Sequence, residues 1–127
     1  MSPPYTTLDN NSLPTAMAEA EAGLLLADGC GFGQYAIELR LSLARIHLDA
    51  DDARAALRRA REALDRATAP ECHYVWGEAD ALDLAGRAHA RLGEIELARQ
   101  RLTAAIGVRE RLSHPRLDDT RTALGPG

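Results

Sequence analysis

The sequence predicts an all-α fold of about five to six antiparallel helices stacked as a repeat solenoid. The chain resembles itself at one constant offset, so that Cys30 recurs as Cys72 and His47 as His89. Ala and Leu dominate while β-branched residues are few, which favours helix over strand. No stretch alternates apolar and polar residues as a half-buried strand does. In such a repeat each unit buries its apolar face only against its neighbours.

The first helix is expected to begin at Ser12-Leu13-Pro14, because proline is tolerated in the first turn of a helix. It should run to about Ala27 or Asp28, since the following segment contains three glycines at alternate positions. These glycines are Gly29, Gly31 and Gly33. The segment therefore predicts one helix followed by a break.

The next four helices follow the repeat. Two apolar stripes over 33–49 predict a helix packed on both sides. Asp51 or Asp52 can cap a third helix over about 52–68, whose inward positions are mostly alanine. A fourth helix is expected over about 73–92, a fifth over about 94–112, and a short last helix over about 115–124. The inward residues expected for the fifth helix are Ile95, Ala98, Leu102, Ala105, Ile106 and Leu112.

A single domain is expected, with a disordered polar leader over 1–12, the repeat domain over 13–124 and a tail over 125–127. The first helix resembles the second half of a unit whose first half is missing. Only two full units are visible, where about three are expected for stability. We therefore expect a fragment of a larger protein or a domain that depends on a partner.

The charge and hydropathy of the chain exclude several classes of function. The formal net charge is −4 and the pI about 5.5, so a nucleic-acid or membrane-surface binder is not expected. The basic residues are all Arg, which suggests a GC-rich bacterial genome. No apolar stretch approaches the roughly 20 residues that span a bilayer, and the N-terminus lacks the features of a signal peptide. A cytoplasmic location is therefore expected.

The segment Leu84–Ile106 resembles a tetratricopeptide repeat. Gly86 matches the small residue of the first helix and Gly93 the turn glycine, while the second helix matches at Ala98, Leu102 and Ala105. The segment Leu43–Leu64 is a weaker copy, and the offset between the copies exceeds the usual repeat length of about 34 residues. The chain also resembles the C-terminal repeat arrays of large bacterial regulatory proteins, in which an ATPase or other effector domain precedes the repeats.

This resemblance implies a right-handed superhelix that acts as a scaffold or sensor and binds a protein or peptide on its concave face. The first helices of each unit would line that face, with Ser42, Leu48 and Ala90 beside the main candidates. The main candidates are Glu38, Leu41, Arg45, Asp49, Asp80, Asp83, Arg87 and Arg91. Two interpretations of the Arg45–Arg87 ladder stay open: the arginines grip an acidic group of a peptide, or they pair with carboxylates inside the domain.

The sequence shows no set of nucleophile, base and orienting group, so no enzymatic activity and no cofactor are expected. His47 and His89 occupy positions that normally serve packing, and Cys72-His73 with Cys30 and His114 matches no zinc spacing. The two cysteines are expected to be unlinked. Two alternatives remain, a regulator gated by a small molecule and a helical metal-binding protein. Self-association through the first helix is also expected to be feasible, because an uncapped repeat leaves apolar surface open.

Overall fold

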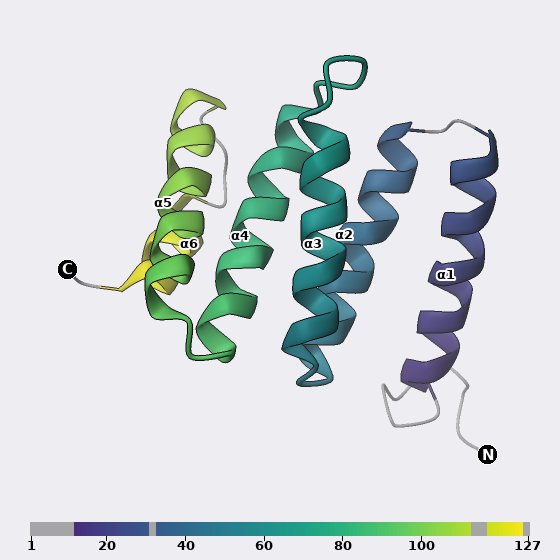
Figure 1. Cartoon of the computed structure of the whole chain (residues 1–127), viewed down its shortest axis with the longest axis horizontal. Helices are drawn as coiled ribbons and strands as arrows, with labels where there is room; N and C mark the ends of the chain where they lie inside the picture. Colours follow the sequence, from purple (N-terminus) through teal and green to yellow (C-terminus); the bar gives the residue numbers. More distant parts are fainter. Residues whose placement is uncertain (1–11, 31–32, 113–116, 126–127) are drawn as a thin grey trace.

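The computed structural model describes residues 12–30, 33–112 and 117–125. Within these residues the chain forms six helices and no strand, which confirms the all-α prediction (Figure 1). The expected leader lies outside the described residues except for Ser12, as does the tail beyond Gly125. The helices are α1 (Ser12–Cys30), α2 (Gly33–Asp49), α3 (Ala53–Ala67), α4 (Val75–Arg91), α5 (Ile95–Leu112) and α6 (Leu117–Leu124).

The repeat seen in the sequence is also present in the helix bounds. Helices that share a place in the repeat begin 42 residues apart, the spacing between Cys30 and Cys72. The pairs of first residues are Gly33 of α2 and Val75 of α4, Val75 and Leu117 of α6, and Ala53 of α3 and Ile95 of α5. The ends of α2 and α4, Asp49 and Arg91, are separated by the same offset. The units α2–α3 and α4–α5 are therefore equivalent, and α6 begins where a third unit would begin.

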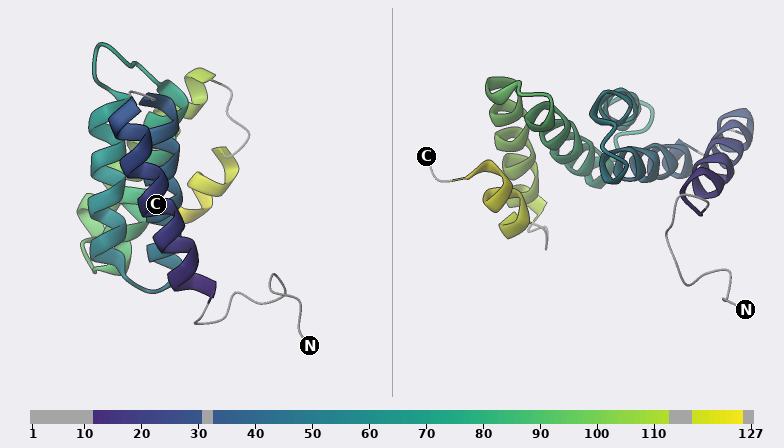
Figure 2. Two further views of the ribbon diagram at one scale, coloured as in Figure 1. Left: turned by 90° about the vertical axis from the view of Figure 1, so that its right-hand side faces the viewer. Right: turned by 90° about the horizontal axis from the view of Figure 1, so that it is seen from below.

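The helices α1 to α5 stand side by side, each antiparallel to the next (Figure 1). Each packs against its neighbour in sequence, and α2 also contacts α4 directly. Viewed from below, α3 lies on one side of the row and α6 on the other, next to α5 (Figure 2, right). The face formed by α2 and α4 is therefore flanked by α6.

Alanine makes up much of the core between α2, α3 and α4. Ala56, Ala60 and Ala63 of α3 are fully buried, and they pack with the larger Ile37 and Leu41 of α2. Small side chains on one helix let the backbones approach closely, so the larger side chains of the next helix fill the remaining space. The inward alanines expected in this helix are confirmed.

The two turns inside the units have the same backbone structure. Asp51 has φ 62° and its counterpart Gly93 has φ 80°, the left-handed conformation that ends many helices. The Asp52 N–H donates to the His47 carbonyl at 2.8 Å, and the equivalent bond from Glu94 to His89 measures 2.9 Å. Asp52 also caps α3 by accepting from the Ala55 N–H at 3.2 Å, as one of the two capping predictions stated.

Gly86 is required by the close approach of α4 to α5. A Cβ atom at this position would lie 2.6 Å from Leu102 Cγ and 3.2 Å from the Ala98 carbonyl oxygen. In the preceding unit the equivalents of Gly86 and Leu102 are Ala44 and Ala60, both fully buried. A glycine facing a leucine in one unit thus replaces an alanine facing an alanine in the other.

One inward residue was predicted wrongly. Ile95 is 59% exposed, although it belongs to the apolar positions assigned to the core. It opens α5, and no helix of the described residues covers its side chain, because the neighbouring α6 is only eight residues long. Tyr35 and Trp76 are also exposed, by 56% and 44%, whereas Tyr74 packs against the core.

Candidate interaction groove

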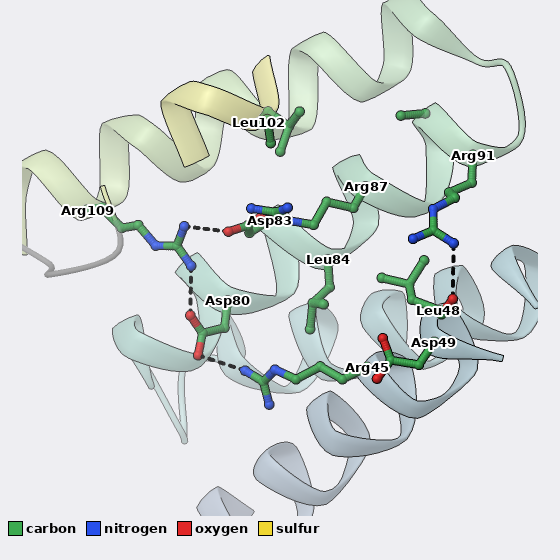
Figure 3. A pocket seen from close by; sticks show the side chains of 12 residues that line it. Arg45, Leu48, Asp49, Asp80, Asp83, Leu84, Arg87, Arg91, Leu102 and Arg109 are labelled. Atoms are coloured by element: carbon green, nitrogen blue, oxygen red, sulfur yellow. Dashed lines mark hydrogen bonds and ion pairs between the residues drawn. The ribbon is translucent and has the colours of Figure 1, made fainter. Parts of the chain in front are cut away.

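A groove of about 660 Å³ opens between α2, α4, α5 and α6 (Figure 3). Its wall contains apolar side chains from all four helices, including Leu48, Leu84 and Leu102. Six of the eight candidate binding residues line it: Arg45, Asp49, Asp80, Asp83, Arg87 and Arg91. The structure therefore brings together residues from the equivalent helices of two successive units.

The other two candidates, Leu41 and Glu38, do not line the groove. Leu41 is fully buried in the core between α2, α3 and α4, so its expected place on the binding surface is wrong. Glu38 is half-buried and accepts a hydrogen bond from the Tyr74 hydroxyl at 2.8 Å. Burial, followed by this bond to Glu38, raises the pKa of Tyr74 to about 12. Glu38 thus connects α2 to the segment before α4.

Asp80 joins two arginines across the groove. Arg45 Nη2 lies 3.3 Å from its Oδ2, and Arg109 Nη2 lies 2.8 Å from its Oδ1 (Figure 3). The three residues come from α2, α4 and α5, so this carboxylate links three helices. A carboxylate that accepts from two guanidinium groups is held in a fixed position.

Asp83 occupies a similar place one turn further along α4. It accepts from Arg87 Nε at 2.5 Å, from Arg109 Nη1 at 2.6 Å and from Thr120 Oγ1 at 3.0 Å. Burial raises the pKa of Asp83, but the hydrogen bonds from Arg87 and Arg109 outweigh burial, and the net pKa is lowered. Asp83 is therefore an ionised, buried anchor of the groove wall.

The sequence reasoning missed Arg109, which lines the groove, and Thr120, which binds Arg109. Arg109 is fully buried, and its Nη1 donates both to Asp83 and to the Thr120 hydroxyl, so it fastens α6 to α4 and α5. The signal was present, because Arg109 continues the inward spacing of Ala98, Leu102 and Ala105 on α5. Thr120 is buried because α6 packs against α5.

The charges that reach the groove surface are mainly basic. The side chains of Arg45, Arg87 and Arg91 are 38%, 39% and 52% exposed, whereas those of Asp80 and Asp83 are 14% and 8% exposed. Asp49 is the exposed acid among the lining residues. Both interpretations of the arginine ladder thus have a basis, since Arg45 and Arg87 pair internally and still reach the surface.

His47 and His89 are placed beneath the two equivalent turns. His89 is buried, with its Nδ1 2.9 Å from Glu94 Oε1. Both ring nitrogens of His47 are buried without a hydrogen-bond partner, and burial lowers the pKa of this imidazole. Among the described residues, no group of three His, Cys, Asp or Glu side chains is arranged to hold a metal ion. Cys72 is free and half-buried, while the side chains of Cys30 and His114 lie outside the described part.

In comparisons with known proteins, no family model, no curated protein and no solved structure matches the chain. None of the helices in the described ranges is sufficiently long and apolar to cross a membrane.

Proposed function

We propose that this chain is a protein-interaction module of tetratricopeptide type, a right-handed superhelix that binds an acidic helical segment of a partner in the groove. It serves as a scaffold or sensor in the bacterial cytoplasm, without enzymatic activity or a cofactor. The observation that carries the proposal is a groove lined by charged and apolar residues, whose exposed charges are mainly arginine. The equivalence of α2–α3 with α4–α5 supports the repeat architecture.

The position of the groove favours a helix as its occupant. In the array, α4 packs against both α2 and α3. The helix equivalent to α4 in the next unit is α6, which ends at Leu124, the counterpart of Leu82 in the middle of α4. The groove lies beside the second half of α4, which lacks the neighbour that a longer α6 would provide. A helix of two to three turns, about 10 residues, has suitable dimensions for this space.

The arginines favour an acidic occupant. Arg91 Nη1 donates to the Leu48 carbonyl at 3.1 Å, which holds its guanidinium over the groove (Figure 3). A guanidinium offers five donors, so Arg45 and Arg91 retain donors beyond these internal bonds. Glutamates beside an apolar stripe would bind these donors while the stripe packs against Ala90 and Ala123. Binding should weaken as the salt concentration rises, because exposed charges are screened.

The test is a titration followed by fluorescence anisotropy. The probe is a fluorescein-labelled helical peptide with an alanine–leucine stripe flanked by glutamates. Ala90→Glu places a carboxylate in the groove at an exposed helical position, and Ala104→Glu makes the same change on the exposed side of α5. We expect Ala90→Glu to weaken binding on the order of tenfold and Ala104→Glu to leave it unchanged. Equal affinity of both variants, or no binding by the unmodified chain, would overturn the proposal.

Asp49→Asn should change the affinity for the acidic peptide in the opposite direction. Asp49 is exposed in the groove wall and repels an acidic ligand, so its neutralisation should tighten binding severalfold. A carboxylate at the C-terminal end of α2 is also unfavourable for the helix dipole, so the substitution should not destabilise the fold. Weaker binding of the acidic peptide by Asp49→Asn would contradict the assignment.

A further inference from the structure

The helix α1 is apolar on two opposite sides. One side packs against α2 through Leu24 and Ala27, with Ala20 beside them. The other side is exposed and carries an apolar stripe, which we call the outer stripe: Ala18, Ala22, Leu25 and Leu26. Leu25 and Leu26 are 76% and 68% exposed, the largest values among the exposed large apolar side chains of the described residues. A helix that is apolar all round is normally covered on both sides.

The equivalent face of α3 is charged. Leu24 of α1 and Leu64 of α3 both pack toward the helix that follows. Aligning these two leucines, which are 40 residues apart and so two residues short of the repeat offset of 42, also pairs Ala20 with Ala60 and Ala27 with Ala67. In this match the outer stripe falls on four charged residues of α3: Arg58, Glu62, Asp65 and Arg66. The repeat therefore does not require an apolar outer face, and the stripe on α1 is a property of this helix alone.

We propose that the outer stripe of α1 binds in the groove of a second copy of this chain. This inference rests on the proposed function, because it names the acidic helix that the groove takes. The chemistry of the two surfaces is complementary: α1 carries Glu19, Glu21 and Asp28 and no basic residue, whereas the exposed charges of the groove are mainly arginine. Two α1 helices packed against each other would instead bring like charges together.

The apolar parts of the two surfaces also match. Leu25 and Leu26 would pack against Ala90 and Ala123, the exposed apolar side chains of the groove, and the alanines of the stripe would allow close approach. Glu21 and Asp28 already pair with Arg59 and Arg40 inside the chain. Glu19 is exposed on α1 and lies nearly two turns before Leu25, so it would meet the arginines at the rim.

This contact joins two different surfaces, so an associated pair of copies still offers one free α1 and one free groove. A heterologous contact of this kind produces rings or open chains of copies, not only closed dimers. The mean mass should therefore rise steadily as the protein concentration increases.

The test is sedimentation velocity of the full chain over a dilution series. The α1 variant is Leu25→Gln with Leu26→Gln, and the groove variant is Ala90→Glu; both change exposed positions, so folding should persist and is checked by far-UV circular dichroism. We expect the unmodified chain to associate and each variant to be monomeric. The matched control, Ile95→Gln with Leu97→Gln, removes two exposed apolar side chains from α5 and should associate normally.

Mixing the two variants distinguishes the proposed contact from symmetric pairing of α1. The α1 variant keeps its groove and the groove variant keeps its α1, so an equimolar mixture should form heterodimers that do not extend further. A monomeric unmodified chain at every concentration, or a mixture that remains monomeric, would overturn this inference. If the chain is monomeric and still binds the acidic peptide at the groove, the proposed function stands and only the identity of the partner is wrong. If the chain neither associates with itself nor binds the acidic peptide, both this inference and the proposed function fail.

Discussion

Arg109 Nη1 lies 2.6 Å from Asp83 Oδ2, and both side chains are almost completely buried. The same guanidinium reaches Asp80 at 2.8 Å and Thr120 on α6. One arginine on α5 therefore fixes the positions of two carboxylates on α4 and of the helix that closes the groove. The groove wall depends on this residue, although its sequence neighbourhood looks like an ordinary charged helix end.

Arg109→Met should destabilise the chain strongly, because it leaves Asp83 and Asp80 without their shared cation in a buried setting. Removal of one partner from a buried ion pair costs about 3–5 kcal/mol. Arg111→Met, an exposed arginine in the last turn of the same helix, should change the free energy of unfolding by less than about 0.5 kcal/mol. Urea denaturation measures both, and similar values for the two variants would contradict the assigned role.

Gly86→Ala should destabilise the chain by about 1–3 kcal/mol, because the new Cβ would meet Leu102 and overpack the α4–α5 contact. Gly107 offers a matched comparison on α5, since a Cβ there would meet no atom within 4 Å. Gly107→Ala should stabilise by roughly 0.5–1 kcal/mol through helix propensity. The unfolding temperatures of the two variants should therefore shift in opposite directions. If both shift in the same direction, the close approach of α4 to α5 is not what requires glycine at position 86.

The equivalent turns predict a second pair of opposite effects. Asp51→Gly should stabilise the chain by up to about 1 kcal/mol, because Asp51 holds φ 62° and glycine adopts this conformation without strain. Gly93→Ala should destabilise it by more than about 1 kcal/mol, because φ 80° is strained for a residue with a Cβ. The free energies of unfolding from guanidinium titrations check both values, and a stabilising Gly93→Ala would refute the equivalence.

Stability should fall as the pH decreases below about 6.5, the ordinary pKa of histidine. Burial lowers the pKa of His47 in the folded chain, so the unfolded chain binds more protons between the two pKa values. The charged groups that also act on this imidazole are Asp52, Arg59, Arg58 and Glu21. Denaturation at pH 7.5, 6.5 and 5.5 should show this slope in the unmodified chain and a smaller slope in His47→Gln.

The control for the pH dependence is His73→Asn. His73 is exposed and has φ 51°, a conformation that asparagine tolerates. This variant should keep the slope of the unmodified chain. If His47→Gln keeps the full slope as well, the acid sensitivity arises elsewhere and the prediction for His47 fails.

Much of the fold could be predicted from the sequence because its strongest signals are local. Ala-rich inward stripes and the glycines placed the helices to within a few residues, and the constant offset of the repeat placed Arg45 and Arg87 on one wall. α1 extended to Cys30, beyond the expected Ala27 or Asp28, because Gly29 did not stop the helix. A single glycine costs a helix only about 1 kcal/mol.

The remaining features of the groove depend on tertiary contacts that local signals do not encode. Leu41 was assigned to the surface because the resemblance places the first helix of each unit on the concave face, and the sequence does not show which sides of α2 are covered by α3 and α4. The packing of α6 against α5, which buries Thr120 and closes the groove, includes the hydrogen bond from the buried Arg109 to the Thr120 hydroxyl. Helical spacing places Arg109 on the inward side, but a charged residue at such a position is normally assigned to solvent.

The most direct test of the central claim is a set of backbone amide chemical shifts recorded while the acidic helical peptide is added to the full chain. The account predicts that the shifting amides cluster on α2 and α4 around Arg45, Leu48, Arg87 and Ala90, with α6 responding at Ala123. Shifts confined to the opposite side of the array, along α3, would contradict it. A peptide that shifts no amide at millimolar concentration would also contradict it.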